Sequence, residues 1–176
     1  MLGKYFRTTV TPIDEVRPTV WNPDDSRVGQ SANAALLEQY KIYVEMADRI
    51  SARRGLTNTF FLTLNTAIFA GIGAAWVGRH SFSTWLLVFP LIVLVAQCCS
   101  WYFLVRSYRQ LNSAKYTVIG VLEERLPASP YWKGEWAALG NGQDKSKYWP
   151  MTHLEQWVPI LFATTYLASF IAIIAS

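Results

Sequence analysis

The sequence predicts an all-α integral membrane protein with three transmembrane helices, and three uncharged segments carry this prediction. Residues 57–77, 84–105 and 156–176 contain no Asp, Glu, Lys or Arg. Each is about 20 residues long, the length of α-helix that crosses a hydrocarbon core of about 30 Å. A buried helix of a soluble protein can also be apolar, but three such segments in 176 residues favour a membrane protein.

Lysine and arginine are distributed unevenly around the three spans. Eight basic residues precede Thr57, one lies between the first two spans, seven lie between the second and third, and none follows the third. Because basic loops stay in the cytoplasm, we expect the N-terminus and the long second loop there and the C-terminus outside. Twelve acidic residues are interleaved with the basic ones, so the net charge of +4 reflects topology and no nucleic-acid partner is expected.

Residues 1–30 are predicted to form an extended arm. Pro12, Pro18 and Pro23 are expected to interrupt any helix there. Several apolar side chains in this stretch suit docking on a neighbour, and a disordered tail is the alternative. No apolar core of a secretory signal is visible, so the first span is expected to act as its own targeting signal.

Two of the spans are expected to continue into the cytoplasm. Residues 31–56 carry apolar side chains at helical spacing among charged ones, which predicts an amphipathic helix that ends at the membrane-edge pair Arg53 and Arg54. Residues 106–126 keep an apolar helical face beyond the second span, residues 84–105. The two extensions are predicted to run antiparallel, so that the first two spans form one long helical hairpin.

The third spanning helix is expected over residues 152–176, after a cytoplasmic or interfacial loop over residues 127–151. Thr152 and Glu155 have the spacing of a capping box, and Trp149 and Trp157 flank them as anchors at the membrane interface.

The spans also contain a histidine–glutamate pair and two prolines. A metal or acid–base site at His153 and Glu155 is disfavoured, because metal sites need three or four convergent ligands and the chain has two histidines. Pro90 and Pro159 are expected to kink or restart the second and third helices.

Polar residues inside the spans are the main candidates for a functional role. Asn58 and Asn65 lie seven residues apart, nearly on one helical face, with Thr59 beside them and Gln97 in the second span. Asparagine in a membrane helix commonly hydrogen-bonds a neighbouring helix, and the alternative is a polar pore lining. The first interpretation is favoured, about two to one as a rough prior.

No enzyme is expected. The chain has no phosphate-binding loop, nucleophile elbow, Cys-x-x-Cys or His-Glu-x-x-His motif, so no catalytic, cofactor-binding or metal-ligating residue is predicted. The uncharged spans also disfavour a proton-coupled transporter or a voltage sensor. Cys98 and Cys99, adjacent within the second span, are assigned to packing.

Three stretches resemble a known family: "LLEQYKIYVEMADRISARRGLTNTFF", "RSYRQLNSAKYTVIGVLEERLP" and "YWPMTHLEQWVPILF". They are similar to the RipA family of small bacterial inner-membrane proteins, described as octameric. The long hairpin also looks similar to SLATT-domain proteins, thought to be pore-forming effectors in bacterial conflict systems. The first resemblance implies a homo-octamer whose partners are its own copies and membrane lipids, and it implies no biochemical activity. Together with the uncharged spans and the polar interhelical residues, it favours a scaffolding function. The alternative is an ion channel or pore-forming effector.

Overall fold

The computed structural model describes residues 11–22, 30–77, 84–142, 144, 146–147 and 151–175. Helices and turns make up these residues, and no strand occurs among them. The chain divides into two compact units. Unit 1 comprises Met1–Ala52 and Tyr108–Trp149, and unit 2 comprises Arg53–Ser107 and Pro150–Ser176.

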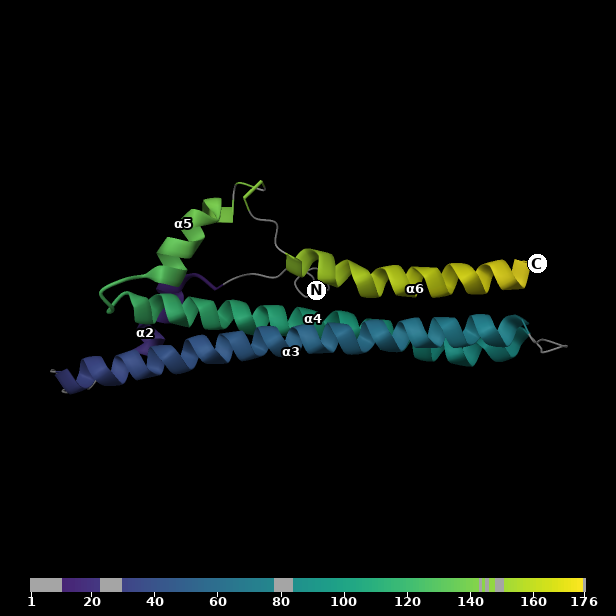
Figure 1. Ribbon diagram of the computed structural model, residues 1–176, viewed down its shortest axis with the longest axis horizontal. Coiled ribbons are helices and arrows are strands. Elements are labelled where there is room, and N and C mark those ends of the chain that lie inside the picture. The colour runs from purple at the N-terminus through teal and green to yellow at the C-terminus, as the bar shows by residue number, and fades with distance from the viewer. Residues whose placement is uncertain are drawn as a thin grey trace. The chain divides into compact units, whose positions relative to one another are not determined.

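Three long α-helices dominate the chain (Figure 1). They are α3 (Gln30–Val77), α4 (Val88–Glu123) and α6 (Met151–Ala175), and each contains a stretch long and apolar enough to cross a membrane. This confirms the predicted all-α class with three candidate spans. The shorter elements are α2 (Ile13–Val20), η1 (Thr84–Leu87), η2 (Pro130–Glu135), α5 (Trp136–Ala138) and η3 (Gly140–Gly142).

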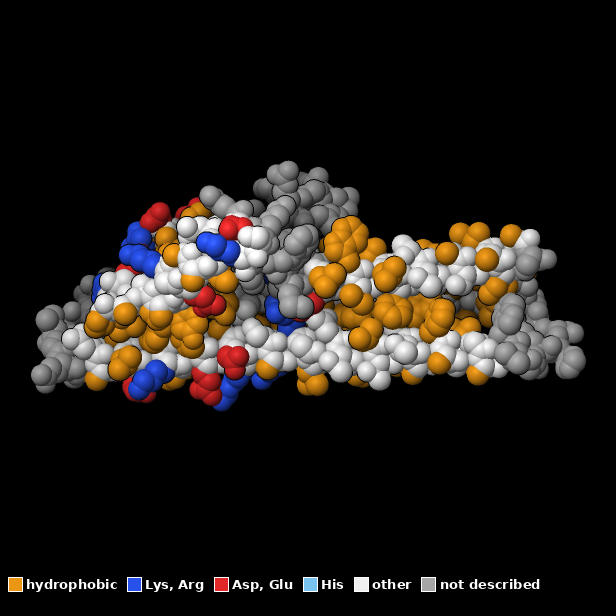
Figure 2. All heavy atoms as spheres, turned by 45° about the horizontal axis from the view of Figure 1, so that its top comes forward, with side chains coloured by type: hydrophobic (Ala, Val, Ile, Leu, Met, Phe, Trp, Pro, Cys, Tyr) orange, Lys and Arg blue, Asp and Glu red, His pale blue; other side chains and the backbone are white. Residues whose placement is uncertain are grey.

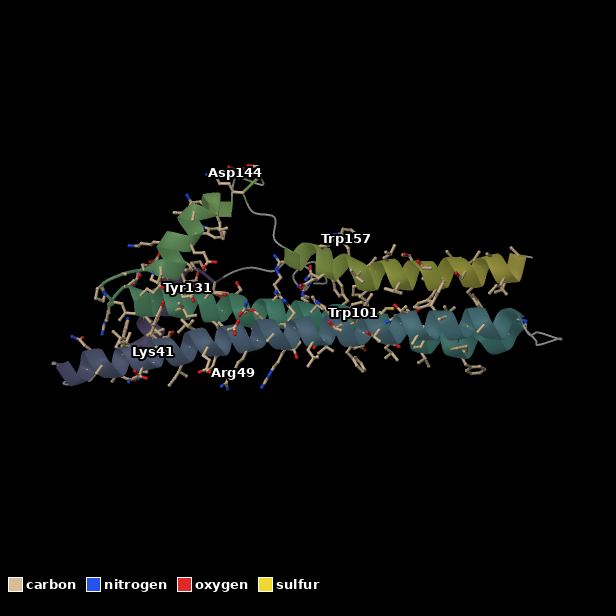
Figure 3. All side chains as sticks on the ribbon, in the orientation of Figure 1. Lys41, Arg49, Trp101, Tyr131, Asp144 and Trp157 are labelled. Carbon is tan, nitrogen blue, oxygen red and sulfur yellow. The ribbon has the colours of Figure 1, made fainter. Side chains whose placement is uncertain are left out.

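Unit 2 contains the apolar parts of α3, α4 and α6. Leu94, Cys98 and Tyr166 form its buried cluster. Trp101 is 1% exposed and stacks on Phe61 with ring centroids 5.6 Å apart. Figure 3 shows Trp101 where the three helices meet. Close packing of these large side chains gives the three helices van der Waals contact inside the unit.

Unit 1 contains the N-terminal part of α3 and the C-terminal part of α4. Asn112 lies 3.3 Å from Ser51, while Glu123 lies 3.0 Å from Tyr40, so the two helices run antiparallel within the unit. Apolar side chains are buried within this unit: Ala47, Ile50, Ile119, Val121 and Leu122. Charged side chains gather on the exterior of this unit, and hydrophobic ones cover α6 in unit 2 (Figure 2).

One expectation for the N-terminal arm is wrong, because Ile13–Val20 is helical. Pro12 precedes the helix with φ −59°, which suits a helix start, and Asp14 and Glu15 complement the dipole of its first turn. Pro18 removes a single backbone donor from a helix of only eight residues. The helix α2 contacts the end of α4 in its own chain, since Arg17 is ion-paired with Glu124 at 2.7 Å.

The predicted loop over residues 127–151 also contains helical segments. Residues 130–142 include η2, α5 and η3, and a left-handed turn lies inside η3 at Gly140 (φ 73°) and Asn141 (φ 54°). Pro90 needs no kink, because η1 gives way to α4 two residues before it and Pro90 lies in the first turn of the new helix. The helix α6 continues through Pro159.

Candidate functional site: the buried polar contacts

Asn65 is fully buried between the three helices of unit 2. Its Nδ2 donates to the carbonyl of Phe61 at 2.8 Å, within α3. Its Oδ1 accepts from the Tyr166 hydroxyl on α6 at 3.0 Å and faces the Cys98 thiol on α4 at 3.7 Å. One side chain therefore contacts both of the other helices, and its polar atoms are satisfied within the chain.

Asn58 lies one heptad earlier on the same face of α3. Its Oδ1 accepts from the indole N–H of Trp101 at 2.9 Å. The structure therefore directs Asn58 and Asn65 toward helices of their own chain. Gln97 lies elsewhere in the unit, and its buried Nε2 has no hydrogen-bond partner among the residues that the structure describes.

The exposed hydroxyl groups of α3 bond to their own helix. Thr59 donates to the carbonyl of Gly55 at 3.1 Å, and Thr66 donates to the carbonyl of Leu62 at 2.8 Å. Each hydroxyl thereby satisfies its donor four residues back along the helix. These side chains thus present mainly methyl groups outward, which suits contact with lipid or with another helix.

The start of α6 is joined to α3 by an ion pair. The Nε of Arg54 lies 3.3 Å from Oε2 of Glu155, with both side chains largely buried. The two atoms are close enough for an ion pair but lack hydrogen-bond geometry. Glu155 thus faces a cation, which a capping box does not predict. Arg53, the neighbour of Arg54, is exposed.

Of the other predicted interface anchors and the helix cap, the structure describes only the side chains of Trp157 and Glu155. Trp157 is 65% exposed and lies on the side of α6 that faces away from α3 and α4 (Figure 3). Trp149 and the side chain of Thr152 lie outside the described residues. The cap therefore stays a prediction.

The sequence analysis did not predict a role for Glu123, the buried carboxylate of unit 1. Glu123 is 2% exposed, at the end of α4. Its Oε1 accepts from the Tyr40 hydroxyl and the Tyr131 amide, both at 3.0 Å. Its Oε2 accepts from the Ser129 hydroxyl at 2.6 Å and the Trp132 amide at 3.0 Å. Four donors thus compensate the buried charge, and the carboxylate holds the start of η2 against α3.

The signal for this clamp in the sequence is weak. Glu123, Glu124 and Arg125 read as a charged helix end, and only the structure distinguishes the buried carboxylate from its exposed neighbours. Gly120 supports the arrangement, because a Cβ there would lie 2.7 Å from the Trp132 ring.

Two pKa values in unit 1 are shifted by these contacts. Burial raises the pKa of Tyr40, and its hydrogen bond to the Glu123 carboxylate raises the pKa further. The phenol therefore remains a donor at neutral pH. Hydrogen bonds from Arg17 lower the pKa of Glu124, and the same contacts raise the pKa of Arg17.

Unit 1 contains a groove of about 560 Å³ between α3, α4 and η2. Its lining mixes aromatic, acidic and basic side chains, including Tyr40, Lys41, Asp48, Tyr116 and Tyr131. Among the described residues, no group of three His, Cys, Asp or Glu side chains is placed to hold a metal ion. The donors around Glu123 leave it in a structural role.

These observations define the class of protein: a helical membrane protein in which Asn58 and Asn65 join α3 to α4 and α6. Residues 37–175 match the octameric membrane protein family (8xMP). The match spans most of the sequence, so the chain belongs to this family. Neither a search of curated proteins nor one of solved structures gives a match.

Proposed function

We propose that the chain is the subunit of a homo-octameric scaffold in a bacterial inner membrane and has no enzymatic activity. The family supports self-assembly in a membrane. The inward orientation of Asn58 and Asn65 is the observation that supports a scaffold rather than a pore. A pore lined by these residues would need them to face a central axis, whereas both accept hydrogen bonds from other helices of their own chain.

Purified particles reconstituted in planar bilayers test the proposal against a channel. A scaffold is expected to give an octamer without conductance above the lipid background. Discrete conductance steps from the octamer would contradict the scaffold and favour the pore. The control is a particle carrying Asn58→Leu, which should abolish conductance only if Asn58 lines a pore.

The proposed topology has a cytoplasmic N-terminus and an external C-terminus, and it rests on the distribution of basic residues. A reporter that works only outside the cytoplasm is expected to be active when fused after Ser176. A cytoplasmic reporter at the same position should be silent. The reverse result would overturn the three-span topology.

A further inference from the structure

The part of α3 in unit 2 has one face that no other described residue covers. Thr59, Thr63, Thr66, Ala70 and Gly73 recur three and four residues apart, and all are exposed. Because α-helical residues at this spacing share a face, these small side chains form one surface. They lie opposite Asn58, Asn65 and Ile68, which face the inside of the unit. We call this surface the small face.

The other exposed surfaces of unit 2 carry bulky apolar side chains beside small ones such as Ala96 and Ala168. On α4, Phe89 is 70% and Val93 is 65% exposed. On α6, Leu161 and Ile171 are each 65% exposed. Bulky apolar side chains suit contact with lipid, whereas small ones let two helix backbones approach closely.

Glycines on α3 give an independent argument. A Cβ added at Gly55, Gly71 or Gly73 would meet nothing within 4 Å. Packing against the described residues therefore does not require glycine at these positions, of which Gly71 lies off the small face. Glycine in a helix is destabilising relative to alanine. A neighbour outside the chain supplies a reason for glycine that the chain itself lacks.

The low burial of α3 within its own chain also favours a contact with a neighbour. Only 6% of the most apolar stretch of α3 is buried within the chain, compared with 22% for α4. The hydroxyls of Thr59 and Thr66 are bonded within α3, so the small face carries no unsatisfied donor from them. It therefore suits a close apolar contact better than a water-filled channel.

We propose that the small face of α3 is the surface on which a second copy of this chain packs in the membrane. The occupant is a copy of the chain because the family is octameric, and its members meet copies of themselves. This inference rests on the proposed self-assembly and adds the surface that produces it.

Three matched tryptophan substitutions test the proposal by native mass spectrometry of detergent-solubilised particles. Ala70 on the small face, Ala96 on α4 and Ala168 on α6 are all exposed alanines of unit 2. Ala70→Trp is expected to raise the dissociation constant of the assembly by about tenfold or more. Ala96→Trp and Ala168→Trp are expected to leave it within about threefold, since lipid accommodates the larger ring.

The outcomes separate the two proposals. If the unmodified chain is monomeric, the proposed self-assembly fails whatever the variants do. If the unmodified chain is octameric and Ala70→Trp remains so, the small face faces lipid and this inference is overturned. Loss of assembly in Ala168→Trp or Ala96→Trp but not in Ala70→Trp would also overturn it and place the contact elsewhere.

A milder substitution guards against misfolding of the Ala70 variant. Gly73→Ala is expected to weaken assembly while helicity by circular dichroism stays unchanged or rises. On a lipid-exposed face, alanine would favour the helix and leave assembly intact. An unchanged or tighter assembly in Gly73→Ala would therefore count against the proposed contact.

Discussion

The hydroxyl of Tyr166 donates a hydrogen bond of 3.0 Å to Oδ1 of Asn65, which lies 101 residues earlier in the chain. The same hydroxyl is 3.3 Å from the Asn65 backbone carbonyl. This contact joins α6 to α3 inside unit 2, where both side chains are buried. In an apolar environment an unpaired Asn65 amide would be costly, so the pair fixes which faces of the two helices meet.

Removal of the Asn65 amide is expected to loosen α6 from α3. Asn65→Leu should lower the unfolding free energy of the protein by about 1–2 kcal/mol, because contacts of this kind between membrane helices have that size. Thermal unfolding in detergent measures the change. A double-mutant cycle with Tyr166→Phe provides the control: the effect of Tyr166→Phe should be smaller in the Asn65→Leu background, where only the backbone carbonyl of residue 65 remains as an acceptor. Additive effects would show that the two side chains do not interact.

Neutralising Glu123 is expected to detach the segment after α4. Glu123→Gln keeps the shape of the side chain but presents an amide donor to groups that are themselves donors. A loss of about 1–3 kcal/mol is expected, as for a buried hydrogen-bonded group left without a partner. Limited proteolysis should then cut within residues 127–135. Glu124→Gln, which changes the exposed neighbour, should leave η2 protected, and equal cleavage of both variants would refute the clamp.

Gly120→Ala is expected to displace Trp132 from α4. The added Cβ would lie 2.7 Å from the indole ring, too close for a carbon–carbon contact. Overpacking of this kind costs about 1–3 kcal/mol and outweighs the gain in helix propensity. Red-shifted tryptophan emission and a lower melting temperature would record the displacement. A melting temperature equal to or above that of the parent chain would show that Trp132 does not pack on Gly120.

Acid is expected to release α2 from the end of α4. The pKa of Glu124 is lowered by hydrogen bonds from Arg17, so its contribution to stability is present above the ordinary value of 4.5. That contribution is lost as the pH falls through the lowered pKa. NMR signals of α2 should therefore stay docked at neutral pH and become mobile only below about pH 4.5. Arg17→Ala should remove this acid transition, and a transition unchanged by Arg17→Ala would contradict the contact.

The membrane spans could be predicted from the sequence because their signal is local. A run of about 20 uncharged residues is sufficient to indicate a spanning helix. The first predicted run lies in α3, the second begins in η1 and continues in α4, and the third overlaps α6. Asn58 and Asn65 could be singled out for the same reason, since a polar side chain stands out in an apolar run.

The partners of these residues could not be predicted, because they depend on distant segments. Nothing near Asn65 in the sequence indicates Tyr166, which reads as an ordinary residue of an apolar helix. Glu123 looked like part of a charged helix end until η2 placed two backbone amides on it. The helix α2 was missed because prolines weigh against a helix locally, while its contact with Glu124 comes from the far end of α4.

The mass of the intact particle, measured by native mass spectrometry, tests the central claim most directly. The account predicts an assembly of eight 20.0 kDa chains, in keeping with the octameric family to which the chain belongs. A particle that stays monomeric in both detergent and nanodiscs would contradict it.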